Sequence, residues 1–134
     1  MDFTTKRSFG AETMSQWTHI TGCLRIDDMT KIFSNVSFID DNFKKSLIEN
    51  SPQGSEGGLD FTFKKGKSGC TNTDNIFFYG DLRDFGEKDL IKIEKFVKWI
   101  QDYLKDNVMI RQLDICCDIE GKEERVYFRE EQEK

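Results

Sequence analysis

The sequence holds little of what metal centres and catalytic sites are commonly built from. Among its 134 residues there is one histidine, His19, and four cysteines that form no C-x-x-C pair. Structural zinc sites draw Cys and His ligands from such spacings, so we expect neither a metal site nor a cofactor. Adjacent Cys116 and Cys117 would point to opposite faces of a strand, which favours reduced thiols that pack as small hydrophobic groups.

Long apolar runs and a basic excess are absent as well. No run approaches the roughly 20 apolar residues of a membrane helix, and the N-terminal residues lack the apolar core of a secretory signal, so no membrane partner is expected. The formal net charge is −5, whereas proteins that wrap nucleic acid carry a basic excess. We therefore expect a cytoplasmic protein for which nucleic acid is an unlikely partner.

Aromatic residues and clear hydrophobic periodicity are what the sequence does have. Its 12 phenylalanines and 37 % hydrophobic residues suffice for the core of one domain, which we assign to residues 14–130. Residues 1–13 precede the first strand and are expected to form a flexible arm. Residues 131–134 are expected to form a charged tail.

Alternating and helical patterns predict the order of the elements. Strands are expected over residues 17–27, 59–65, 76–85 and 108–119, with a short fifth over 125–128, and helices over 40–51 and 86–107. This β-α-β-β-α-β order predicts the α+β class and a ferredoxin-like sandwich, in which both helices cover one face of an antiparallel sheet. Residues 66–75 are expected to form a loop, and helix 40–51 to bury Phe43, Leu47 and Ile48.

The stretch WTHITGCLRID, residues 17–27, places an unusual set of side chains on the face of the sheet away from the helices. Side chains alternate across a strand, so its odd-numbered residues share one surface while Leu24 and Ile26 point to the core. On the third strand we choose the more polar alternation for the same surface. The predicted surface contains Trp17, His19, Arg25, Asp27, Lys64, Tyr79, Asp81 and Arg83, with Arg111 at the sheet rim or at a bulge.

These residue types suit recognition of a nucleotide. Aromatic rings are stacking platforms for bases, and arginine binds phosphate through paired hydrogen bonds. The GSEGG segment, residues 54–58, adds Ser55, Glu56 and Gly57, because successive glycines let backbone N–H groups converge on an anion. It does not have the P-loop pattern, and a plain turn is its alternative interpretation. A homodimer interface is the alternative for the whole surface, and a homo-oligomer is expected.

Catalysis is the less favoured interpretation. His19 is the one conventional base near neutral pH, and Ser55 does not stand in a recognised nucleophile context. Asp81 and Asp84 are spaced as metal ligands can be, but nothing in the sequence brings their oxygens to one point. An ion pair with Arg83 or, for Asp84, a helix cap is the favoured interpretation. We predict no catalytic residue, and keep a small nucleotide-processing enzyme that uses His19 as an alternative.

Several stretches resemble small accessory proteins of tailed bacteriophages: WTHITGCLRID, GSEGG, YGDLRDF, the long amphipathic helix and VMIRQLDI, which together span most of residues 15–120. The resemblance carries no catalytic assignment. It implies a counter-defence protein in the cytoplasm of an infected bacterial host, either a sponge that sequesters a nucleotide immune signal or an inhibitor, such as an anti-CRISPR, that binds a host defence protein. A sponge binds a small phosphorylated ligand without chemistry, so the predicted surface favours a sponge for a cyclic oligonucleotide or cyclic ADP-ribose.

Overall fold

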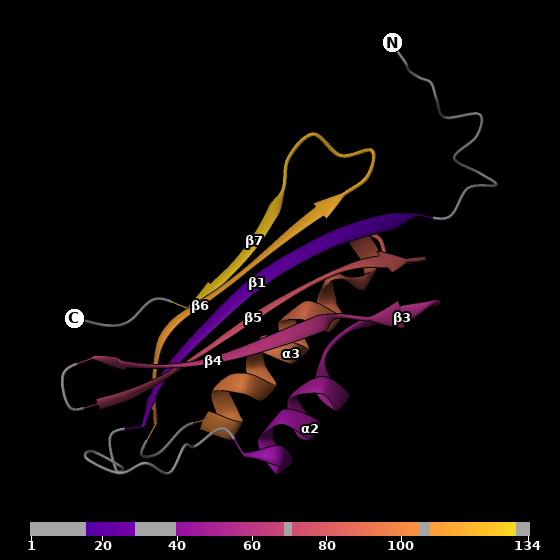
Figure 1. Ribbon diagram of the computed structural model, residues 1–134. Helices are drawn as coiled ribbons and strands as arrows, with labels where there is room; N and C mark the ends of the chain where they lie inside the picture. Colours follow the sequence, from indigo (N-terminus) through magenta and orange to yellow (C-terminus); the bar gives the residue numbers. More distant parts are fainter. Residues whose placement is uncertain (1–15, 29–39, 69–70, 105–107, 131–134) are drawn as a thin grey trace.

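The computed structural model describes residues 16–28, 40–68, 71–104 and 108–130, and shows an α+β arrangement (Figure 1). The expectations for residues 1–13 and 131–134 concern residues outside these ranges. The elements are β1 (Trp17–Asp28), α2 (Asp41–Asn50), β2 (Gln53–Gly54), β3 (Gly57–Gly58), β4 (Asp60–Ser68), β5 (Thr71–Arg83), the short 3₁₀ helix η2 (Glu87–Asp89), α3 (Leu90–Leu104), β6 (Val108–Ile119) and β7 (Val126–Glu130).

The main sheet has five strands in the order β4-β5-β1-β6-β7, and every neighbouring pair is antiparallel. The central strand β1 pairs with β5 on one side and with β6 on the other. Helices α2 and α3 lie on the same face of this sheet (Figure 1). The predicted α+β class and antiparallel sheet are therefore confirmed, and β7 extends the sheet by a fifth strand. Strands β2 and β3 form a separate hairpin.

The core lies between the sheet and the helices, and its residues follow the two periodicities of strands and helices. On β1, Ile20, Leu24 and Ile26 are buried. Helix α3 contributes a buried stripe at helical spacing: Ile93, Phe96, Ile100 and Leu104. The Phe96 ring contacts the Phe78 ring edge to face, with centroids 6.0 Å apart and an interplanar angle of 78°. The central layer of the core is thus aromatic, as the phenylalanine content of the sequence suggests.

Gly22 on β1 allows the Phe78 ring to lie directly against the backbone of the sheet. A Cβ atom on Gly22 would stand only 2.1 Å from Cε2 of Phe78. Phe78 is buried, and its ring also contacts Phe61 at a centroid distance of 5.4 Å. The ring therefore fills the space that a side chain at position 22 would need.

Both helices begin near the predicted residues, with two corrections. Asp40 caps α2, since its Oδ1 accepts a hydrogen bond from the Phe43 N–H at 2.8 Å. Ile48 was expected in the core, but its side chain is 44 % exposed, because it lies one position outside the buried stripe of α2. Asp84 does not cap the long helix: its φ of 57° places it in a left-handed turn, and Asp89 accepts the Gly86 N–H at 2.9 Å instead.

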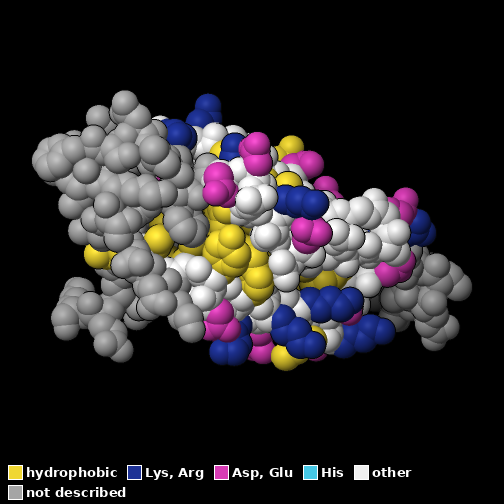
Figure 2. All heavy atoms as spheres, turned by 90° about the horizontal axis from the view of Figure 1, so that it is seen from below, with side chains coloured by type: hydrophobic (Ala, Val, Ile, Leu, Met, Phe, Trp, Pro, Cys, Tyr) yellow, Lys and Arg dark blue, Asp and Glu magenta, His cyan; other side chains and the backbone are white. Residues whose placement is uncertain are grey.

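The helix side of the molecule exposes some hydrophobic side chains. Figure 2 shows hydrophobic side chains in the middle of this view, with basic and acidic side chains around them. Tyr103 of α3 is 42 % exposed there and packs on Phe43 of α2, with ring centroids 5.4 Å apart. No helix among the described residues is long and apolar enough to span a membrane.

The loop predicted over residues 66–75 is wrong. Strand β4 continues to Ser68 and β5 begins at Thr71, with Gly66 opposite Thr73 and Lys64 opposite Asn75. These polar residues show no hydrophobic alternation, so the sequence pattern did not predict that they extend β4 and β5. Here the pairing with neighbouring strands, rather than hydrophobicity, decides strand formation. The extension matters for the helix-free face, since it lets β5 pair with β1 from Trp17 to Asp27.

Arg111 forms a β-bulge in β6. Gln112 pairs with Arg25 and Ile110 pairs with Ile26, so Arg111 has no residue opposite it on β1. This confirms the prediction that Arg111 lies at the rim or at a bulge. The extra residue restores the alternation, so that β6 keeps hydrophobic side chains on the core face on both sides of the bulge.

Candidate functional site

Most of the predicted residues fall into two separate groups near opposite ends of β1, and Tyr79 lies between them. The hairpin-end cluster lies where β1 begins and β5 ends, and consists of Trp17, His19, Ser55, Glu56, Gly57, Asp81 and Arg83. The bulge-end cluster lies at the other end of β1 and consists of Arg25, Asp27, Lys64 and Arg111. At a rise of about 3.3 Å per residue, His19 and Arg25 are roughly 20 Å apart. The predicted residues therefore do not form one site.

His19 is held between two carboxylates in the hairpin-end cluster. Its Nδ1 lies 2.5 Å from Oδ1 of Asp81 on β5, and its Nε2 lies 2.7 Å from Oε2 of Glu120, directly after β6. Both contacts are hydrogen bonds that favour the doubly protonated imidazolium, and the one to Asp81 contributes most to raising the pKa of His19 above its ordinary value of 6.5. The imidazolium thus links three consecutive strands of the sheet.

This arrangement makes the stability of the protein depend on pH. Because the folded pKa of His19 is raised, its contribution is fully present below the unfolded pKa and is lost as pH rises through the folded pKa. The His19 side chain is 41 % exposed, so we expect at most about 1 kcal/mol. The free energies of unfolding of wild type and His19→Gln, measured in urea, should differ most near pH 6, where the carboxylates are ionised and the pH is below the unfolded pKa of about 6.5. They should differ least above the folded pKa.

The single histidine also allows its pKa to be read directly. One His19 imidazole Hε1 resonance is expected in a proton NMR titration, with a midpoint above 6.5 in wild type and a lower midpoint in Asp81→Asn. A wild-type midpoint at or below 6.5 would contradict the placement of His19 between the carboxylates of Asp81 and Glu120. A stability difference between wild type and His19→Gln that is constant with pH would contradict it too.

The GSEGG segment forms most of the β2–β3 hairpin, which contacts the end of β5. The Ser55 N–H donates to the Arg83 carbonyl at 2.9 Å, and the Ser55 hydroxyl donates to Oδ2 of Asp84 at 2.6 Å. Glu56 forms an ion pair with Arg83. Gly54 is required by close approach, since a Cβ there would lie 2.6 Å from the Arg83 backbone oxygen. These contacts give the hairpin a structural role and occupy the Ser55 donors that an anion would need.

The bulge-end cluster is differently arranged. Arg111 reaches back from the bulge, so that its Nε lies 3.3 Å from Oδ2 of the buried Asp27. Arg25 is exposed, and its Nε donates to Oδ1 of Asn75 at 3.0 Å. Lys64 is exposed on β4, and the described residues place no carboxylate within ion-pair distance of either Arg25 or Lys64. Two cationic groups therefore face solvent on this half of the sheet.

Exposed aromatic rings lie on the helix-free face in the rows between the two clusters. Tyr79 is 59 % exposed and Phe77 is 44 % exposed, both on β5, and Tyr127 on β7 is 53 % exposed. The alternation predicted for the third strand placed Phe77 and Tyr79 on this face, but only Tyr79 was predicted as a site residue, and Tyr127 was missed. The signal for Phe77 was present, because it lies two residues before Tyr79 and shares its face. Thr21 and Cys116 lie between Tyr79 and Tyr127 in the same row across the sheet.

The thiols and acids on this face have ordinary structural environments. Cys23 lies opposite Phe77, and partial burial raises the pKa of its thiol, which disfavours the reactive thiolate. Asp114 and Asp118 of β6 form ion pairs with Arg129 and Arg125, at 3.4 and 3.6 Å. In the described part of the chain, no three His, Cys, Asp or Glu side chains are grouped so that they could hold a metal ion.

Comparison with known proteins adds no family to this description. The chain matches no protein-family model, no curated protein and no solved structure.

Proposed function

We propose that the helix-free face of the sheet binds a nucleotide and does not convert it. The observation that carries the proposal is the exposure of Phe77 and Tyr79 side by side on β5, at 44 % and 59 %. Large aromatic rings in the middle of a sheet face are normally covered, and an uncovered pair is a stacking surface for planar groups. Successive residues on one face of a strand are about 6.6 Å apart, so each ring can take a separate base.

The charge around these rings fits a phosphorylated ligand. Phe77 pairs with Cys23 on β1 and with Thr62 on β4, so Arg25 and Lys64 are its diagonal neighbours on either side. Diagonal neighbours across a sheet are about 7–8 Å apart, within reach of long side chains. A base stacked on Phe77 would therefore have a guanidinium and an ammonium group beside its phosphate. The net charge of −5 favours a small nucleotide over a polynucleotide.

The surroundings of His19 support binding without catalysis. A histidine that acts as a general base needs one ring nitrogen directed at the substrate. Both nitrogens of His19 are instead engaged by Asp81 and Glu120. Binding without turnover is what sequestration requires, so we propose the role of a sponge for a nucleotide immune signal in counter-defence.

We also propose that the domain is a ferredoxin-like sandwich lengthened by β7. Strands β1 and β4 are both antiparallel to β5, which lies between them, and are therefore parallel to each other. They are connected through α2, so β1-α2-β4 is a split βαβ unit. Strands β5 and β6, connected through α3, enclose β1 in the same way.

A thermal-shift screen tests the proposed ligand class. The intact protein is heated with cyclic dinucleotides, cyclic trinucleotides or cyclic ADP-ribose isomers. A ligand at 100 times its dissociation constant should stabilise the protein by about 2.7 kcal/mol, which is a clear shift in Tm. A flat screen over all three classes would overturn the nucleotide proposal and direct attention to a host protein as the partner.

Variants of the stacking residues test the proposed surface. For a ligand found in the screen, Tyr79→Ala and Phe77→Ala should each weaken binding by about tenfold or more in calorimetry, since each stacked base is worth about 1–3 kcal/mol. Arg25→Ala should also weaken binding, because a phosphate contact is lost. The difference in affinity between this variant and wild type should grow as the salt concentration is lowered. Ile91→Ala is the matched control, since Ile91 is 50 % exposed on α3. Unchanged affinity in Tyr79→Ala and Phe77→Ala together would place the ligand elsewhere.

A further inference from the structure

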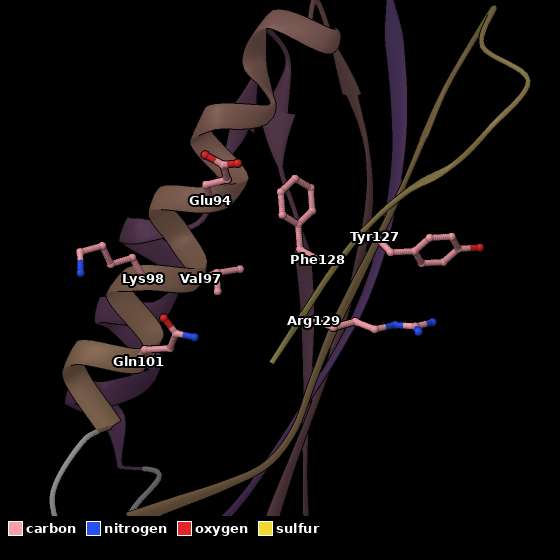
Figure 3. Close-up of a pocket in the computed structure, with 7 residues that line it drawn as sticks. All are labelled: Glu94, Val97, Lys98, Gln101, Tyr127, Phe128 and Arg129. Carbon is pink, nitrogen blue, oxygen red and sulfur yellow. The ribbon is translucent and has the colours of Figure 1, made fainter. Parts of the chain in front are cut away.

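The outer edge of β7 is the feature of the fold that the proposed function leaves unused. Strand β7 ends the sheet, so one side of its backbone has no neighbouring strand among the described elements. Beside it lies an open cavity of about 360 Å³ between β7 and α3, lined by Glu94, Val97, Lys98, Gln101, Tyr127, Phe128 and Arg129. In Figure 3 the Phe128 side chain lies toward α3, while Tyr127 and Arg129 point away from it.

The two edges of the sheet differ in how they resist association. Strand β4, the opposite edge, carries Lys64 and Lys65 in consecutive positions, and both are exposed. Lysines on an edge strand oppose pairing with a second copy, because like charges would be brought together. Strand β7 has the sequence VYFRE, in which one arginine and one glutamate accompany three large apolar or aromatic residues. The β7 edge is thus the one that can accept another strand.

We propose that β7 pairs antiparallel with β7 of a second copy, joining two sheets into one, with Phe128 at the two-fold axis. In this register Tyr127 lies opposite Arg129 of the second copy, and Val126 lies opposite Glu130. Each Arg129 already lies over its own Tyr127 ring, 5.1 Å from the centroid, so pairing sets it between two tyrosines.

Charge excludes the neighbouring registers. Opposed residues must share a face, so the register can shift only in steps that preserve the alternation. Centring the axis on Tyr127 would set Arg125 against Arg129 of the second copy. Centring it on Arg129 would set that arginine against itself. Like charges directly opposite are destabilising, which leaves Phe128 as the centre.

The α3 helices of the two copies extend the proposed contact. A two-fold axis perpendicular to the sheet puts both α3 helices on the same side and antiparallel to each other. Glu94 and Lys98 line the cavity beside Phe128 and are exposed. The antiparallel arrangement brings Glu94 of each copy toward Lys98 of the other, so the charges are complementary. It also leaves both helix-free faces uncovered and on one side of a joined sheet.

Charge reversal on α3 tests this interface. Sedimentation equilibrium of the intact protein should show a monomer–dimer equilibrium. Glu94→Lys should weaken dimer association by about tenfold, and the double variant Glu94→Lys/Lys98→Glu should restore it. A mixture of the two single variants, Glu94→Lys and Lys98→Glu, should associate more strongly than either alone. Glu49→Lys, an exposed reversal on α2, is the control and should leave the equilibrium unchanged.

Three outcomes would overturn the proposal. One is a monomer up to roughly 1 mM protein, a concentration at which even a weak dimer is half formed. Another is a dimer that Glu94→Lys does not weaken, or one that the double variant does not restore. The third is a dimer abolished by Phe77→Ala/Tyr79→Ala, because that result would locate the contact on the helix-free face instead.

Discussion

Replacing Phe96 by alanine is expected to lower the unfolding free energy by about 3–5 kcal/mol, the range for deleting a buried aromatic side chain. Phe96 is 1 % exposed and joins the sheet to α3 through its edge-to-face contact with Phe78. It also stacks on Trp99, with centroids 6.4 Å apart. The truncation therefore opens a cavity where the aromatic layer of the core is centred. Small domains are stable by only about 5–15 kcal/mol, so a large part of the stability would be lost.

Urea unfolding followed by tryptophan fluorescence measures this effect. Phe96→Leu should recover more than half of the loss, because it refills most of the cavity. Ile91→Ala on the same helix is the matched control, and its 50 % exposure predicts a change within about 0.5 kcal/mol. A loss in Phe96→Ala no larger than that of the control would mean that the core is not organised around this ring.

Replacing Gly22 by alanine is expected to cost about 3 kcal/mol, the upper part of the range for overpacked cores. In an ordinary strand the same change would be mildly favourable, because glycine loses more conformational freedom on folding. Here the new methyl group would lie 2.1 Å from the Phe78 ring, which Phe61 and Phe96 hold from two other sides. Because of this clash, Gly22→Ala should lower the free energy of unfolding rather than raise it.

A double variant separates this clash from a backbone requirement. Gly22→Ala/Phe78→Leu should be more stable than the sum of the two single effects, because the smaller side chain makes room for the methyl group. Additive effects in chemical denaturation would show that the ring does not cause the loss. Thr21→Ala, at the adjacent exposed position, should change the stability by no more than about 0.5 kcal/mol.

Much of the fold could be predicted because hydrophobic periodicity is strong in this chain. The alternation in β1 and the helical spacing in α3 identified both elements and the faces they bury. The polar end of the β4–β5 ribbon could not be predicted, since residues such as Thr73 and Asn75 lack that signal and are held by β1 and β4. Strand pairing between distant segments is information that a local pattern does not contain.

The candidate site could be predicted only in part. Alternation placed Tyr79 and Arg25 on the helix-free face, but position along the strands, which separates Arg25 from His19, depends on register. The two carboxylates on His19 come from residues 62 and 101 positions away in the sequence. Glu120 directly follows the end of β6, and no sequence pattern predicted its contact with His19. Its role depends on the turn after β6, where its N–H donates to the Trp17 carbonyl at 3.0 Å.

The bulge at Arg111 has a consequence for how the chain can change length during evolution. Arg111 stands outside the pairing between β6 and β1, so its loss would leave Ile110 and Gln112 opposite the same partners as before. Loss of a paired residue elsewhere in β6 would instead turn part of the strand over and expose its core side chains. Relatives that are one residue shorter should carry the gap here, accompanied by a neutral residue in place of Asp27, whose buried carboxylate Arg111 compensates.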